Sequence, residues 1–311
     1  MNAQEITFGV EIECLFPAGQ QPERIGQYHH GIQVEGLPAG WNSQRDGSLQ
    51  PDAGFVGVEI VSPILRGTDG LAQIKAVCDW LRSKGVKVNK SCGLHVHVGF
   101  QQRSARQLAQ LVSLVAKNEK ALFAITGTQS REQGHYCKPI KEDFRPVGSR
   151  GNLRNCSAVR DRYHLLNLSS LACGGRPTVE FRCFAGTTNA TKIKGYVQVC
   201  VGLVVKALKT KAKIKYDAEP LATNGRVTKE GAGETAANRL FYQLFWKFGD
   251  DFRPTSTDPK WSPLGVIEPE TLAKSGALLL KLARKYDGNA TDEVEAEVAP
   301  AVAAPVQTSP I

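Results

Sequence analysis

Acidic, imidazole and guanidinium side chains recur on one face of four predicted strands. In ITFGVEIEC, apolar residues alternate with Gly9, Glu11 and Glu13, and FVGVEIVSP, GLHVHVGF and TVEFRCF alternate in the same way. The polar faces of these strands carry Glu11, Glu13, Glu59, His95, His97, Glu180 and Arg182. Carboxylates and imidazoles are metal ligands, and arginine binds phosphate or carboxylate with two parallel hydrogen bonds.

Each strand taken alone has a second interpretation, because a strand at the protein surface also alternates polar with apolar residues. Surface strands usually carry Lys, Thr, Ser and mixed charge, whereas these polar faces carry Glu, His, Arg and Gly. If the four strands share one sheet whose apolar face packs on helices, four carboxylates come close together. They raise one another's pKa unless cations bind among them, so the pattern predicts a metal site.

The predicted ligands favour a hard cation, Mg²⁺ or Mn²⁺, over zinc, which prefers more nitrogen and sulfur. Such ions usually hold phosphate in proteins. If the ligands are one ATP and one substrate carboxylate, these two ligands and the four glutamates carry a charge of about −9, against about +4 from two Mg²⁺ ions. The remaining positive charge must come from basic side chains. Besides Arg182, the segment SRGNLRNCSAVRDRYHLLNL supplies Arg150, Arg154, Arg160 and Arg162.

Several common catalytic motifs are missing from the sequence. Neither a Walker A loop nor a GxGxxG turn occurs, so metal and arginine must hold any phosphate in place of backbone amides. GxSxG and HExxH are also missing, so kinases of the P-loop type and serine hydrolases are left without support. The eight cysteines never form CxxC, and we expect most of them to be reduced core residues.

Taken in order, four motifs resemble the amidoligase family, within the glutamine synthetase and γ-glutamylcysteine ligase superfamily. They are ExE on the first strand, DGSL before GVEIVSP, SCGLHVHVG, and TVEFR. The resemblance covers about residues 5 to 209. It implies an α+β fold, in which a curved, mainly antiparallel sheet backed by helices binds nucleotide and substrate on its concave face.

The resemblance also implies metal ligands. Glu11 and Glu13 resemble ligands of separate Mg²⁺ ions, with Glu59 joining Glu13, and with Glu180 joining Glu11 or a bridging position. His95 resembles the imidazole that binds metal or phosphate.

Further roles follow from the same resemblance. His97 resembles an imidazole on the nucleotide side, and Arg182 the group that neutralises the phosphoryl group in transfer. The γ-phosphate of ATP passes to a substrate carboxylate, and an amine attacks the acyl phosphate. Arg154 and Arg162 are candidates for substrate or phosphate contact, although solvent exposure explains either of them equally well.

Two more residues carry open alternatives. Asp46, in RDGSL, is a candidate to accept a proton from the attacking amine or to orient it, and Asp-Gly is equally a turn signal. Asn167, in YHLLNLSSL, is a candidate for substrate binding or for capping a neighbouring strand.

Predicted helices must support this sheet. One begins at Thr68 or Asp69 and ends at Gly85, a second begins at Ser104 and runs toward Gly127, and a third begins near Asn189 and is apolar almost all round. Two more are predicted near 234–248 and 269–286, as a C-terminal helical layer. We expect a catalytic domain over 1–209, a helical extension over 210–289, and a disordered acidic, Ala/Pro-rich tail over 290–311.

Composition limits the partners. The 311 residues have a formal charge of +9, while the last 25 hold five acids and no Lys or Arg, so the body of the chain is more basic still. That excess suits an anionic ligand such as a nucleotide. No run is apolar enough for a bilayer, and the N-terminus lacks a secretory signal, so we expect a cytoplasmic protein. The sequence does not determine the oligomeric state, although a single-chain site is preferred over a ring of subunits.

Three functions compete at this stage. The first is an ATP- and Mg²⁺-dependent ligase that joins a small-molecule or peptide carboxylate to an amine. The second is a metal-dependent hydrolase in which the same Glu and His residues activate water. The third is a non-catalytic basic module that binds nucleic acid, a partner we do not expect.

Overall fold

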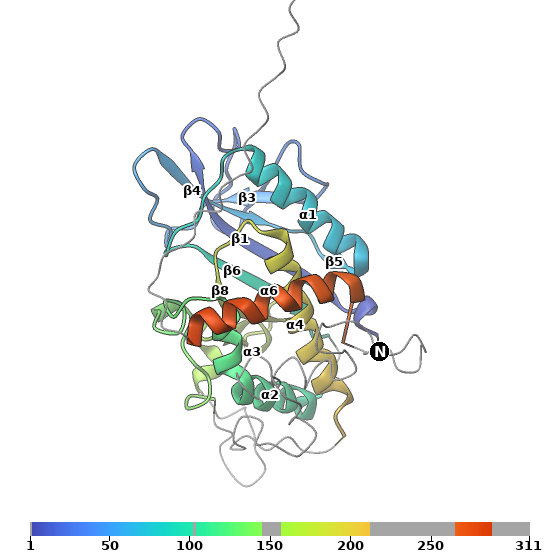
Figure 1. Cartoon of the computed structure of the whole chain (residues 1–311). Coiled ribbons are helices and arrows are strands. Elements are labelled where there is room, and N and C mark those ends of the chain that lie inside the picture. The colour runs from blue at the N-terminus through green and yellow to red at the C-terminus, as the bar shows by residue number, and fades with distance from the viewer. Residues whose placement is uncertain (1, 102–103, 145–156, 212–264, 288–311) are drawn as a thin grey trace, which may run out of the picture.

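A computed structural model describes residues 2–101, 104–144, 157–211 and 265–287, which form a curved open sheet with helices (Figure 1). The sheet holds eight strands in the order β2-β3-β4-β1-β6-β8-β7, with β5 paired to β1 beside that path. All pairings between these strands are antiparallel, which confirms the α+β prediction. The strands are β1 (Thr7–Pro17), β2 (Ile32–Gln33), β3 (Asn42–Gln44), β4 (Phe55–Val61), β5 (Leu65–Arg66), β6 (Gly93–Gly99), β7 (Leu166–Asn167) and β8 (Thr178–Ala185).

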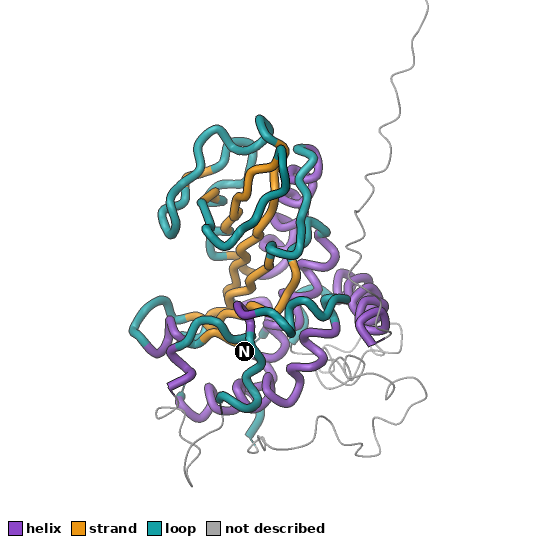
Figure 2. Tube along the Cα trace, turned by 90° about the vertical axis from the view of Figure 1, so that its left-hand side faces the viewer, coloured by secondary structure: helices purple, strands orange, loops and turns teal. Residues whose placement is uncertain are grey.

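Helices gather on one side of the sheet, and Figure 2 shows the strands between these helices and a layer of loops. The central helix is α4, which contacts α1, α2, α6 and β6. The helices are α1 (Gly67–Ser83), α2 (Ala105–Ala124), α3 (Ser169–Ala172), α4 (Ala190–Lys209) and α6 (Pro269–Asp287), with 3-10 turns η1 (Ala3–Glu5), η2 (His135–Cys137) and η4 (Ser157–Arg160).

The sequence correctly predicted two helix starts. Ser104 accepts a hydrogen bond from the backbone N–H of Gln107 in a capping box, and Asn189 accepts from two N–H groups in the first turn of α4. The predicted ends also hold, because Gly85 and Gly127 both have positive φ, which glycine adopts without steric cost.

The predicted cap of α1 is wrong. This helix begins at Gly67 and has Arg66 at its N-cap, so Thr68 and Asp69 lie inside the first turn. Leu65 and Arg66 pair with β1 as β5, and the chain leaves that strand at Gly67 (φ 56°), which starts the helix earlier than predicted. Asp69 still contributes a negative charge near the positive end of the helix dipole.

The predicted apolar strand faces are buried in the core. These residues are Phe8, Val10 and Ile12 of β1, Val58 and Ile60 of β4, Leu94, Val96 and Val98 of β6, and Val179 and Phe181 of β8. Simple alternation fails in one place, where a bulge shifts the register between β6 and β8. The shift pairs Phe184 with Leu94, and the Phe184 ring stacks on Tyr196 of α4 with ring centroids 4.3 Å apart.

One of the two predicted C-terminal helices lies within the described residues. The helix predicted over 269–286 is α6, which packs against α4 and α2. The helix predicted near 234–248 and the tail over 290–311 lie outside the described residues. In the part of the chain that the structure describes, none of the helices is both long and apolar enough to cross a bilayer.

Candidate active site

Strand register brings the predicted polar residues together on the face of the sheet opposite the apolar core. Directly opposed residues of an antiparallel pair lie on the same face of the sheet. The opposed pairs are Glu13 with Glu59, Glu11 with His95, and His97 with Glu180. We call these six residues the acidic cluster.

His95 lies at the centre of the acidic cluster. Its Nδ1 is 3.1 Å from Glu11 Oε2 and 3.6 Å from Glu180 Oε1, and its Nε2 is 3.6 Å from Glu13 Oε1. His97 Nε2 lies 3.1 Å from the other oxygen of Glu11. One buried imidazole therefore contacts acids from two neighbouring strands, β1 and β8.

Three sets of side chains bring potential metal-ligand atoms within 4.8 Å of one another. The sets are Glu11, Glu59 and His95; Glu11, His97 and Glu180; and Glu13, Asp46 and Glu59. Two sets share Glu11 and two share Glu59, so neighbouring cation positions could have carboxylates in common. Oxygen atoms predominate among the donors, which suits Mg²⁺ or Mn²⁺ better than zinc.

Hydrogen bonds fix the orientation of two of these carboxylates. Gln44 of β3 donates its side-chain N–H to Glu59 Oε2 at 2.6 Å. Asn167 of β7 donates in the same way to Glu180 Oε2 at 2.6 Å, while Arg182 Nη1 lies 2.5 Å from Glu180 Oε1. The acids are thereby held in place before any ligand binds, as outer partners of metal ligands commonly do.

The acidic cluster carries more negative charge than its own cations offset. Burial and the charge of Glu11 raise the pKa of Glu59 to about 9. Burial opposes a charged His97, yet the neighbouring Glu11 and Glu180 carboxylates raise the pKa of His97 to about 9. The residues therefore fit a bound divalent cation, which would replace these protons as the balancing charge.

Two carboxyl groups of the cluster are held ionised. Burial alone would raise their pKa, but His97 and His95 hold the pKa of Glu11 well below its usual value. His97 and Arg182 likewise lower the pKa of Glu180 against the effect of burial. Glu11 and Glu180 are therefore ionised at neutral pH and available to bind a cation.

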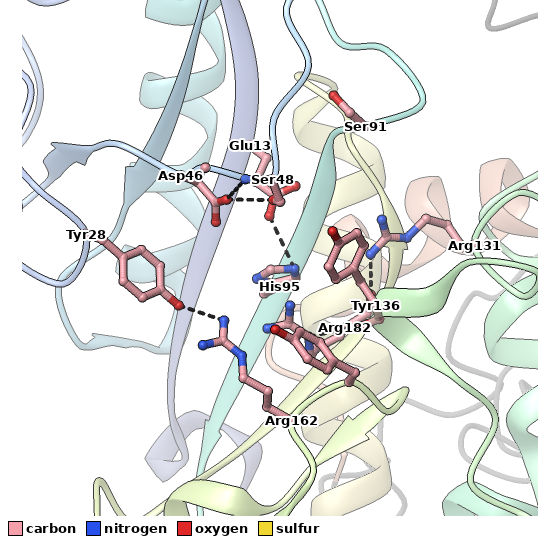
Figure 3. Close-up of a pocket in the computed structure, with 12 residues that line it drawn as sticks. Glu13, Tyr28, Asp46, Ser48, Ser91, His95, Arg131, Tyr136, Arg162 and Arg182 are labelled. Atoms are coloured by element: carbon pink, nitrogen blue, oxygen red, sulfur yellow. Dashed lines mark hydrogen bonds and ion pairs between the residues drawn. The ribbon is translucent and has the colours of Figure 1, made fainter.

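A cavity of about 380 Å³ opens beside Glu13, Asp46 and His95 (Figure 3). Its other side is formed by guanidinium and phenol groups, which we call the arginine wall. The arginine wall consists of Tyr28, Arg131, Tyr136, Arg162, Tyr163 and Arg182. The cavity thus places carboxylates opposite guanidinium groups, an arrangement that can hold a metal-bound polyanion from both sides.

The two residues with open alternatives make local hydrogen bonds. Asp46 Oδ1 accepts from the backbone N–H and the hydroxyl of Ser48 at 2.7 and 2.6 Å, so it orders its turn and also lines the cavity. Asn167 accepts from the backbone N–H of Ser169 while donating to Glu180, which gives it an orienting role toward that acid. Substrate contact by Asn167 stays a prediction.

The proposed nucleotide contacts lie in different places. Arg162 lines the cavity and donates a hydrogen bond to the Tyr28 hydroxyl at 2.6 Å. His97 belongs to the acidic cluster, and the described cavity lining does not include it. Arg154 lies outside the described residues, as does Arg150.

Sequence reasoning missed several residues of the cavity and Gln44, the hydrogen-bond partner of Glu59. Tyr28, Arg131 and Tyr163 lie on loops and Tyr136 in the short turn η2, where no periodic pattern marks them. Gln44 was missed because β3 is three residues long, too short to show alternation. The available signal was that Gln44 precedes Asp46 by two residues, the spacing of side chains that share one face of an extended chain.

A family model described as "Putative amidoligase enzyme" matches residues 38–204, more than half of the chain. The chain belongs to this amidoligase family. Membership supports a carboxylate–amine ligase kind of function. The matched region contains β4, β6 and β8, whereas β1, with Glu11 and Glu13, precedes it. The strand register therefore brings the ExE motif of β1 next to Glu59 and His95, which lie within the matched region.

Other comparisons give distant neighbours. Among curated proteins, the chain has no match. A bifunctional glutathione synthetase from Pasteurella multocida is 11% identical with a TM-score of 0.44, over 91% of this chain and 46% of its own. A GmaS/ADP complex is 11% identical with a TM-score of 0.40, over 91% of this chain and 69% of its own. This chain thus spans about half the length of the glutathione synthetase.

Proposed function

We propose that this amidoligase uses ATP and Mg²⁺ to join a carboxylate to an amine through an acyl-phosphate intermediate. The observation that carries the proposal is the register of β4, β1, β6 and β8, which gathers the acidic cluster on one face next to the arginine wall. A carboxylate is a poor electrophile until one of its oxygens becomes a leaving group, and transfer of the γ-phosphate of ATP supplies that leaving group.

The acidic cluster would hold the cations. Glu13 with Glu59, and Glu11 with Glu180, are the proposed ligand pairs, and His95 lies between the two pairs. Bound Mg²⁺ would neutralise phosphate charge and orient the phosphates for transfer. Gln44 and Asn167 keep two of the acids oriented by hydrogen bonds.

The other residues act on the reacting groups. Arg182 lies in the cavity lining, paired with Glu180, and is the proposed partner of the phosphoryl group in transfer. After the amine attacks the acyl carbon, it must lose a proton and phosphate must leave. Asp46 is the proposed proton acceptor, because Ser48 fixes its carboxyl group at the cavity wall.

The substrate classes follow from the same chemistry. We expect a small-molecule or peptide carboxylate and an amine, at a site formed within one chain, in a protein of the cytoplasm. The basic balance of the chain suits the anionic nucleotide.

The test is ADP formation by the purified full-length protein with Mg²⁺, ATP and a panel of amino acids and peptides, with mass spectrometry of the products. ADP release that requires both a carboxylate and an amine supports the proposal. Absence of nucleotide binding together with absence of ADP across the panel contradicts it. Hydrolysis of an amide with no nucleotide present would favour the metal-dependent hydrolase instead.

A further inference from the structure

Arg131 is a buried member of the arginine wall that makes no ion pair with an acid in the described part of the chain. It is 8% exposed and lines the cavity. Its Nη2 donates to the backbone carbonyl of Arg182 at 2.8 Å, whereas its buried Nε has no hydrogen-bond partner among the described residues. A buried cation with an unsatisfied N–H is unfavourable unless a ligand supplies the acceptor.

The loop that carries Arg131 holds it in a fixed position. The backbone carbonyl of Arg131 accepts from the N–H of Gly134 at 3.1 Å and from the Cys137 thiol at 2.8 Å. With the bond from Nη2 to Arg182, both the backbone and the guanidinium are fixed. In Figure 3 the guanidinium points toward the side of the cavity where Tyr136 and His95 lie.

Gly93 of β6 leaves the room that Arg131 occupies. A Cβ atom at this position would lie 2.9 Å from Arg131 Nη2, 3.2 Å from Nη1 and 3.2 Å from Glu13 Oε2. The guanidinium and a proposed metal ligand therefore approach the same point of the strand, two residues before His95. An oxyanion bound here could reach both the guanidinium and a cation held by Glu13.

The other guanidinium groups of the arginine wall already have side-chain partners. Arg182 pairs with Glu180, and Arg162 donates to the Tyr28 hydroxyl and lies over the Tyr163 ring, 5.6 Å from its centroid. Arg131 differs because its guanidinium is buried and forms no ion pair with an acid among the described residues. A bound ligand oxyanion would supply the missing negative charge.

We propose that Arg131 binds an oxyanion of the reactants, a role that rests on the proposed ligase function and assigns a site residue outside the recognised motifs. The oxyanion is the terminal phosphate of ATP or the carboxylate that receives it. Both groups present the paired oxygens that a guanidinium recognises.

The test is calorimetric titration of full-length Arg131→Gln with Mg·ATP, Mg·ADP and L-glutamate. Losing a charge-assisted hydrogen bond weakens binding roughly tenfold or more. Weaker Mg·ATP binding with Mg·ADP binding kept assigns the oxyanion to the terminal phosphate. Weaker L-glutamate binding with both nucleotides unchanged assigns it to the carboxylate.

Controls separate binding from folding. Arg176→Gln removes an equal charge from an exposed position outside the cavity lining, and we expect wild-type affinities. Arg131→Lys keeps the charge and is expected to recover part of the lost affinity, with a melting temperature close to wild type, even if Arg131→Gln folds poorly.

Two outcomes overturn the assignment in distinguishable ways. If both Arg131 variants bind all three probes as the wild type does, Arg131 is a structural residue and the ligase proposal is untouched. If the wild-type protein itself binds neither nucleotide, the ligase proposal fails and the assignment fails with it.

Discussion

The acidic cluster, through Glu13 and His95, borders the same cavity as the arginine wall, but the two regions are built differently. All six residues of the acidic cluster lie on long strands, where alternation and register determine their direction. Five of the six residues of the arginine wall lie on loops or short turns, and Arg182 on β8 is the exception. A sheet can thus fix a rigid cation site, while loops supply most of the guanidinium and phenol groups of the cavity.

The largest expected effect comes from removing a strand-borne acid. Glu11→Ala removes a carboxylate shared by two candidate metal sets, so we expect ATP turnover to fall at least roughly a hundredfold. The fold should remain, because Glu11 faces the cluster and not the core. Steady-state kinetics and circular dichroism check both expectations.

The adjacent position on the opposite face is the matched control. Val10 is 1% exposed in the core, and Val10→Asp should lose about 3 kcal/mol or more of unfolding free energy. If Glu11→Ala destabilises the protein as much as Val10→Asp does, Glu11 is structural and the assignment of the acidic cluster is wrong.

The next effect concerns orientation of an acid. Asn167→Ala removes the hydrogen bond to Glu180 and should raise the Mg²⁺ concentration needed for half-maximal turnover by roughly tenfold. A change in ATP affinity at saturating Mg²⁺, with the Mg²⁺ requirement unchanged, would instead favour direct ligand contact by Asn167.

A smaller effect is expected where the two regions meet. Gly93→Ala places a methyl group against the Arg131 guanidinium and the Glu13 carboxylate. We expect oxyanion affinity to fall by roughly fivefold to tenfold although both charges remain. Calorimetric titration of the variant with Mg·ATP and with L-glutamate measures this affinity. Wild-type affinity for both probes would mean that the guanidinium moves aside without losing its ligand.

The smallest effect is a gain in stability of the metal-free protein. Burial, and then the Glu11 charge, raise the pKa of Glu59 to about 9, so the folded protein keeps a proton there that the unfolded chain releases above about pH 4.5. Stability should therefore fall as pH rises between these two values. Glu59→Gln removes this loss and should add about 1 kcal/mol at pH 8.

Melting curves in EDTA between pH 5 and 9 provide the measurement for Glu59→Gln. A variant that is less stable than wild type at pH 8, or equally sensitive to pH, would show that the pKa of Glu59 is not raised in the folded protein.

Particular elements show where sequence reasoning worked. Gly9, Glu11 and Glu13 alternate with buried residues, and β1 carries them on one face as predicted. Ser104 and Asn189 cap their helices because hydroxyl and amide oxygens accept locally exposed N–H groups. The prediction failed at α1, where pairing of Arg66 with β1 outweighed the local capping signal of Thr68 and Asp69.

The sequence by itself determined which faces of the long strands are apolar and which carry acids and imidazoles, because side-chain direction alternates along any extended chain. Only the tertiary structure decided that Glu13 lies opposite Glu59, that a bulge returns Phe184 to the helices, and that Arg131 reaches the space above Gly93. Those contacts join residues far apart in the chain through register and loop paths, and local periodicity contains no information about either.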